Sequence, residues 1–204
     1  MKLKKLLALT LTGAMLTASL TACMPLDAAE LVYDSIFGGG SSSTGSGTGS
    51  AAEDAENREV AAGAADHFKG IYQITEVSYG VPELTRTIQP KFTPDWFLKD
   101  GEGNISGLDK DSYINSSQTL GGFLKASLKD YMEQSGNYVG FFAFDSTGMS
   151  AGDQAAQFKN IDNVPKVGVL LPYGQPTPTK LHVEVCHKTV AGRKYCLVVV
   201  VGAC

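Results

Sequence analysis

The strongest β-strand pattern of hydrophobic and polar residues lies near the C-terminal end of the 204-residue chain. Two runs there, Lys180–His187 and Lys194–Val201, are rich in valine and other residues that favour β-strands. The segment between them, Lys188–Arg193, contains Gly192, which suits a turn. The pattern therefore predicts an antiparallel β-hairpin at the end of the chain.

The two cysteines of this hairpin suggest its register. If Cys186 lies opposite Cys196, then Val183 faces Val199, and one face of the ribbon becomes uniformly apolar while the other is mixed. A Cys186–Cys196 disulfide is expected on this basis, provided that the body lies in an oxidising compartment. Cys204, the last residue, is left over by this pairing.

One segment in the middle of the chain has the spacing of a helix. Its apolar residues recur every three or four positions: Leu120, Phe123, Leu124, Leu128, Tyr131 and Met132. Ser116 or Ser117 is suited to cap its start, and Gly136 to end it. We predict one main helix here.

Shorter runs, bounded by Gly, Pro and Asp, predict additional strands. These are Ile71–Tyr79, Leu84–Gln89, Asp95–Lys99, Asn104–Leu108, Asn137–Phe144 and Lys166–Leu171. Together with the main helix they predict an α+β fold, with an antiparallel sheet, one main packed helix and a C-terminal β-hairpin.

The N-terminal part of the chain has a different pattern. Residues 1–22 begin with lysines and continue as an apolar run, as a signal peptide does. Gly38–Ser50 contains only Gly, Ser and Thr, a composition typical of a flexible coil that spans roughly 20 Å. Ala51–Asp66 is alanine-rich and is expected to be a frayed helix. We therefore divide the chain into a signal peptide (1–22), a lipid-anchored tether (23–66) and a single globular domain (67–204).

The apolar run ends on Leu20-Thr21-Ala22-Cys23, which resembles the lipobox of bacterial lipoproteins. The resemblance covers the first 23 residues and implies cleavage before Cys23 and lipidation of that cysteine. Acyl chains on Cys23 would hold the protein on a membrane of the bacterial cell envelope, with its body in the periplasm or on the cell surface. A plain secretory signal and a membrane span are the alternatives, although the apolar run is at the short end for a span.

Charge narrows the choice of partners. The chain has 17 basic and 21 acidic residues, so loss of Lys2, Lys4 and Lys5 with the signal leaves 14 against 21, a net charge of −7. Such an acidic body is unsuited to non-specific nucleic-acid binding. The expected partners are the membrane, through the lipid on Cys23, and an envelope protein.

Gly148-Met149-Ser150-Ala151-Gly152 matches the G-x-S-x-G pattern of serine hydrolases and lies between a predicted strand and a short helix. Asp162 follows Ser150, and His182 or His187 would complete a Ser–Asp–His order. The competing interpretation is a turn that leads into a helix cap. With 23 glycines in the chain, the pattern also arises readily by chance.

Two segments of the chain contain candidate metal ligands. Asp100, Glu102, Asn104 and Asp109 resemble part of a calcium-binding loop, but Leu98 occupies the first ligand position and an ordinary β-turn explains the same residues. His182, Glu184 and Cys186 alternate on one strand as zinc ligands can, yet a disulfide at Cys186 would remove the thiolate. We expect neither a metal nor a cofactor.

The sequence thus favours a membrane-tethered envelope lipoprotein with a non-catalytic binding or structural role. A small serine hydrolase that uses Ser150 is the alternative.

Overall fold

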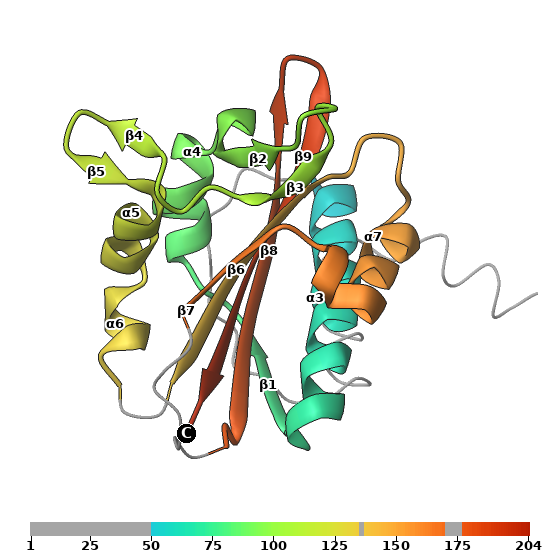
Figure 1. Cartoon of the computed structure of the whole chain (residues 1–204). Coiled ribbons are helices and arrows are strands. Elements are labelled where there is room, and N and C mark those ends of the chain that lie inside the picture. The colour runs from blue at the N-terminus through green and yellow to red at the C-terminus, as the bar shows by residue number, and fades with distance from the viewer. Residues whose placement is uncertain (1–49, 135–136, 170–176) are drawn as a thin grey trace, which may run out of the picture. The chain divides into compact units, whose positions relative to one another are not determined.

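The largest sheet has five strands in the residues that the computed structural model describes, which are 50–134, 137–169 and 177–204 (Figure 1). Its strand order is β1-β8-β9-β6-β7. The strands are β1 (Glu76–Tyr79), β6 (Tyr138–Asp145), β7 (Lys166–Val169), β8 (Lys180–Val190) and β9 (Arg193–Ala203). All described residues belong to one compact unit of the chain.

Strands β8 and β9 form the predicted C-terminal hairpin. They are joined by Ala191 and Gly192, which both have positive φ angles of 50° and 79°, as in a type I′ turn. This two-residue turn pairs Cys186 with Leu197 and His187 with Cys196. The predicted register, with Cys186 opposite Cys196, is therefore wrong by one residue. Because side chains alternate along a strand, the two cysteines point to opposite faces of the sheet.

The α+β class is confirmed, but the sheet is mixed rather than purely antiparallel. Strand β9 pairs antiparallel with β8 and β6, and β6 pairs antiparallel with β7. Strand β1 lies parallel to β8, with Ser78 opposite His182. A parallel pair needs a long connection, and about a hundred residues separate these two strands along the chain.

One face of the sheet is covered by α3 (Ala51–Tyr72), α7 (Ala151–Gln157) and η3 (Phe158–Asn163) (Figure 1). Helix α3 buries Val60, Ala61, Ala64 and Ala65 against this face. Residues 51–66 are therefore part of the folded body, although the sequence interpretation assigned them to the tether and began the domain at His67. Small alanine side chains allow the helix to pack closely, which a count of large apolar residues does not reveal.

The opposite face packs against shorter elements. These are η1 (Leu84–Ile88), α4 (Gln89–Lys91), η2 (Pro94–Trp96), α5 (Leu120–Ser127), α6 (Lys129–Met132) and two small sheets, β2 (Phe97–Lys99) with β3 (Ile105–Leu108) and β4 (Tyr113–Asn115) with β5 (Gln118–Thr119). Their core contains edge-to-face aromatic pairs, including Trp96 with Phe92 and with Phe141.

Three predicted elements differ from the structure. The main helix exists but is divided into α5 and α6 at Leu128, whose ψ of 18° departs from α-helical values. The predicted strand Leu84–Gln89 is helical and buries Leu84 and Ile88, four residues apart, on one side. Helix α3 continues to Tyr72 and ends at Gln73 in a left-handed conformation, so the strand predicted from Ile71 begins only at Glu76. No helix in the described part of the chain is long and apolar enough to cross a membrane.

Candidate functional site

Ser150 lies at the N-terminus of α7, where it forms a capping box with Asp153. Its Oγ donates to Asp153 Oδ2 at 2.7 Å and accepts from the Asp153 backbone N–H at 3.2 Å. The capping box uses the hydroxyl to satisfy a helix end. The G-x-S-x-G match is therefore a turn followed by a helix cap.

The other residues of the predicted triad each have a different partner. Asp162 contacts Lys166, His182 contacts Ser78, and His187 contacts Asn57 and Gln154. Within the described residues, no hydrogen bond links Ser150 to any of these three candidates. The order of residues in the sequence is thus not matched by proximity in space.

The predicted calcium ligands form a turn between β2 and β3. Asp100 Oδ1 accepts the backbone N–H groups of Glu102 at 2.9 Å and Asn104 at 2.8 Å. These hydrogen bonds, chiefly those from Asn104, hold the pKa of Asp100 below its usual value. Asp109 accepts backbone N–H groups of Asp111 and Ser112 in the following turn. In the part of the chain that the structure describes, no three His, Cys, Asp or Glu side chains are grouped to hold a metal ion.

Cys186 and Cys196 are both buried and carry no disulfide bond in the structure. Cys186 contributes to the core beneath α5, whereas Cys196 contributes to the core beneath α3. Burial raises the pKa of both thiols, so they remain protonated at neutral pH. A disulfide bridge needs two Cβ atoms that point toward each other, whereas these two cysteines point to opposite faces of the sheet. This arrangement does not provide the geometry of the predicted disulfide.

Residues 1–49 lie outside the described part of the chain. They include the predicted signal peptide, the lipobox with Cys23, and residues 24–49 of the predicted tether. Ser50 is the first described residue and caps α3, where its side chain accepts the backbone N–H of Glu53. The first described helix therefore starts directly after the Gly/Ser/Thr tract of the sequence.

A polar cluster around two buried side chains joins both helices to the C-terminal hairpin. It comprises Glu56 and Asn57 of α3, Gln154 of α7, His187 of β8 and Lys194 of β9, and is called the His187 cluster below. The His187 side chain is only 3% exposed, and Gln154 is fully buried. Three segments that are distant in sequence, α3, α7 and the C-terminal hairpin, thus meet at one point of the sheet.

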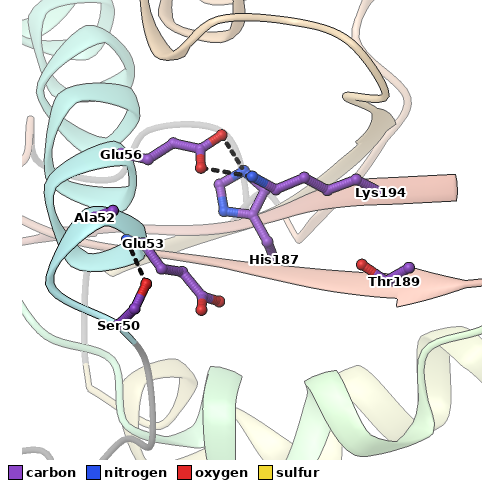
Figure 2. A pocket seen from close by; sticks show the side chains of 7 residues that line it. All are labelled: Ser50, Ala52, Glu53, Glu56, His187, Thr189 and Lys194. Atoms are coloured by element: carbon purple, nitrogen blue, oxygen red, sulfur yellow. Dashed lines mark hydrogen bonds and ion pairs between the residues drawn. The ribbon is translucent and has the colours of Figure 1, made fainter. Parts of the chain in front are cut away.

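Hydrogen bonds fix the orientation of each group in the cluster. The Gln154 amide nitrogen donates to Glu56 Oε1 at 2.6 Å, so its carbonyl oxygen faces His187 Nε2 at 2.7 Å. That ring nitrogen must therefore donate. The other ring nitrogen, Nδ1, lies 2.7 Å from Asn57 Oδ1. Because a neutral ring that donates from Nε2 has no proton on Nδ1, this contact is a hydrogen bond only with the Asn57 amide turned so that its Nδ2 faces the ring. Lys194 Nζ donates to Glu56 Oε2 at 2.5 Å (Figure 2). Together with its bond to Gln154, this contact makes Glu56 link α3 to both α7 and β9.

Burial determines the charge of the imidazole. It lowers the pKa of His187 to about 4, assisted by the positive charge of Lys194 and opposed by Glu56. Burial alone would raise the pKa of Glu56, but hydrogen bonds from Lys194 and Gln154 outweigh it and the pKa is lowered. At neutral pH the cluster thus contains a neutral imidazole and one carboxylate–ammonium pair.

An open depression of about 440 Å³ lies beside the cluster and is also lined by Glu53 and Thr189 (Figure 2). The cluster side chains direct their polar atoms mainly toward one another. Chemically, the arrangement is suited to fastening α3 and α7 to the hairpin, because every hydrogen bond joins two different elements.

Sequence reasoning identified His187 but not its partners. Glu56 precedes Val60 and Ala64 at intervals of four residues, so a packed helix over Ala51–Asp66 would have placed Glu56 on the buried side. Gln154 carried no signal beyond its position four residues after the cap Ser150.

Comparison with known proteins adds no relative from which a role could be transferred. No protein-family model, curated protein or solved structure matches this chain.

Proposed function

We propose that this chain is a lipoprotein of the bacterial cell envelope. In this proposal the signal is removed before Cys23, lipid on Cys23 holds the protein on a membrane, and the folded body binds an envelope partner or supports envelope structure. The observation that carries the proposal is the Leu20-Thr21-Ala22-Cys23 ending of the apolar run.

The start of the folded body supports this arrangement. Helix α3 begins at Ala51 with Ser50 as its cap, directly after thirteen residues of Gly, Ser and Thr, Gly38–Ser50. A tract of this composition does not supply apolar side chains for a core. A linker between Cys23 and α3 would separate the acidic body from the lipid surface.

The His187 cluster supports a binding or structural role for the body. Its polar groups surround the buried side chains of His187 and Gln154 and connect α3, α7, β8 and β9. A satisfied network of this kind stabilises one arrangement of a fold, as a rigid binding module requires.

Membrane fractionation of the full chain expressed in a bacterium tests the proposal. We expect the wild-type protein in the membrane fraction and in the detergent phase after phase separation, and Cys23→Ser in the soluble fraction. Cys204→Ser is the matched control, since Cys204 is the exposed cysteine of the folded body and its loss should leave the protein on the membrane. A Cys23→Ser protein that still fractionates with lipid would contradict the anchor.

Crosslinking in intact cells tests the role of the body. With wild-type protein, the same crosslinked envelope component should be recovered repeatedly, and recovery should fall in Cys23→Ser, whose folded body is unchanged. Equal recovery from both variants would show that tethering is not needed for the interaction.

A further inference from the structure

Ser78 and His182 form a hydroxyl–imidazole pair across the parallel strands β1 and β8. The two residues lie directly opposite each other in the register, and Ser78 Oγ is 2.5 Å from His182 Nδ1. Both side chains are partly exposed, so a small molecule from solvent can approach them. The sequence pattern does not predict this contact, because β1 and β8 are far apart along the chain.

The direction of this hydrogen bond depends on the tautomer of the ring. Burial lowers the pKa of His182, assisted by Lys180 and opposed by Glu76, so the imidazole is neutral at pH 7. In the tautomer with its proton on Nε2, Nδ1 accepts and the Ser78 hydroxyl donates to it; in the other tautomer the hydroxyl donates to the Leu181 carbonyl, 3.4 Å away. The first of these is the arrangement in which an imidazole activates a hydroxyl as a nucleophile.

Side chains from the neighbouring elements complete the surroundings. The Tyr131 ring of α6 lies 6.3 Å from the His182 ring, centre to centre. Burial, the charge of nearby Glu83 and a hydrogen bond to it raise the pKa of Tyr131 to about 12, so it stays a phenol. Burial also raises the pKa of Glu184, which accepts the backbone N–H of Val81. The negative charge of Glu76 acts on the His182 ring and raises its pKa. The Glu76 carboxylate is itself paired with Lys180 Nζ at 3.0 Å.

We propose that Ser78 is an acyl-acceptor site, with His182 as its general base and an activated ester or thioester as the acyl donor. The Ser78 oxygen attacks the acyl carbon and a new Oγ–C bond forms. The bond between that carbon and the leaving oxygen or sulfur breaks. The hydroxyl proton passes to His182 Nδ1 and then to the leaving group, so the products are O-acyl-Ser78 and a free alcohol or thiol.

This inference goes beyond the proposed envelope role, since it assigns the body one covalent modification rather than a turnover reaction. It also differs from the Ser150 hypothesis. Ser150 donates its proton to the Asp153 carboxylate in a helix cap, whereas Ser78 lies within hydrogen-bond distance of an imidazole that is neutral at pH 7. Of the two serines, Ser78 is the one with a base suited to accept its proton near neutral pH.

Acetylation by p-nitrophenyl acetate tests the site on the full folded chain. The tryptic peptide that contains Ser78 is followed by mass spectrometry against the peptide that contains Ser150. We expect acetyl on Ser78 to accumulate first, to disappear in Ser78→Ala, and to form about 10²- to 10⁴-fold more slowly in His182→Gln. The matched control Ser150→Ala should leave the rate at Ser78 unchanged.

The dependence on pH separates activation from mere exposure. In the wild type, the rate should fall as His182 is protonated, with a midpoint below the usual histidine value of about 6.5. In His182→Gln this midpoint should be absent, and circular dichroism should show that the variant is folded. The proposal is overturned if folded His182→Gln acetylates Ser78 as fast as the wild type, or if Ser78 reacts no faster than Ser150.

Discussion

At the scale of single residues, one histidine couples the stability of the fold to pH. The folded-state pKa of His187 is about 4, whereas a histidine in an unfolded chain has a pKa of about 6.5. The unfolded chain therefore takes up the proton first as the pH falls. Stability from His187 is fully present above about pH 6.5 and is lost between about pH 6.5 and pH 4.

This difference predicts a measurable slope. The free energy of unfolding should decrease by about 3 kcal/mol between pH 6.5 and pH 4 through His187 alone, since each pKa unit corresponds to about 1.4 kcal/mol. Denaturant titrations at several pH values measure this decrease. In His187→Gln most of the slope should vanish, while His182→Gln should retain it. An unchanged slope in His187→Gln would place the titrating group elsewhere.

The two buried cysteines provide a second prediction at this scale. Because Cys186 and Cys196 point to opposite faces of the sheet, we expect both to remain thiols even under oxidising conditions. Protein unfolded without reductant should be alkylated at both positions, and peptide mapping should recover their peptides separately. Recovery of a single linked peptide would mean that the register of β8 and β9 differs from the one described.

At the scale of elements, the hairpin illustrates how far a pattern reaches. The alternation in Lys180–His187 and the valine run in Lys194–Val201 were sufficient to predict β8 and β9. These patterns were not sufficient to predict the register of the two strands, because that depends on the turn. The turn places Ala191 at a φ of 50°, a conformation for which glycine, asparagine or aspartate would have been a recognisable signal and alanine is not.

Helix α3 illustrates the opposite error, in which the element was expected but its packing was missed. An alanine-rich face with one valine gives a weak amphipathic pattern, and such a pattern does not predict a helix packed against the core. In the structure its small residues permit close contact with α7. A Cβ atom added at Gly63 would lie 2.6 Å from Ala155 Cβ and 2.9 Å from Ala155 Cα.

Two glycines of this helix therefore form a matched pair for mutation. Gly63→Ala should destabilise the protein by about 1–3 kcal/mol, because α3 and α7 must separate to admit the methyl group. Gly70→Ala meets no atom within 4 Å and should stabilise the helix by up to about 1 kcal/mol. Thermal unfolding of both variants checks the two signs. Equal effects at both positions would contradict the close contact.

At the scale of the whole molecule, the sequence predicted a globular domain but placed its boundary too late. That boundary, His67, followed from the first large apolar residues, whereas α3, which starts at Ala51, already packs against the sheet. The candidate sites show a similar limit. Ser78 with His182, and His187 with Gln154, are contacts between distant segments, and local spacing contains no information about them.

The central claim is that the mature chain begins at a lipidated Cys23, and its N-terminal peptide tests it most directly. Trypsin should release Cys23–Arg58 from protein isolated from bacterial membranes, because Arg58 is the first basic residue after Cys23. We predict that mass spectrometry will find this peptide with diacylglycerol and an acyl chain on Cys23 and no residue before it. An unmodified peptide that begins at Cys23, or one that still contains signal residues, would contradict the account.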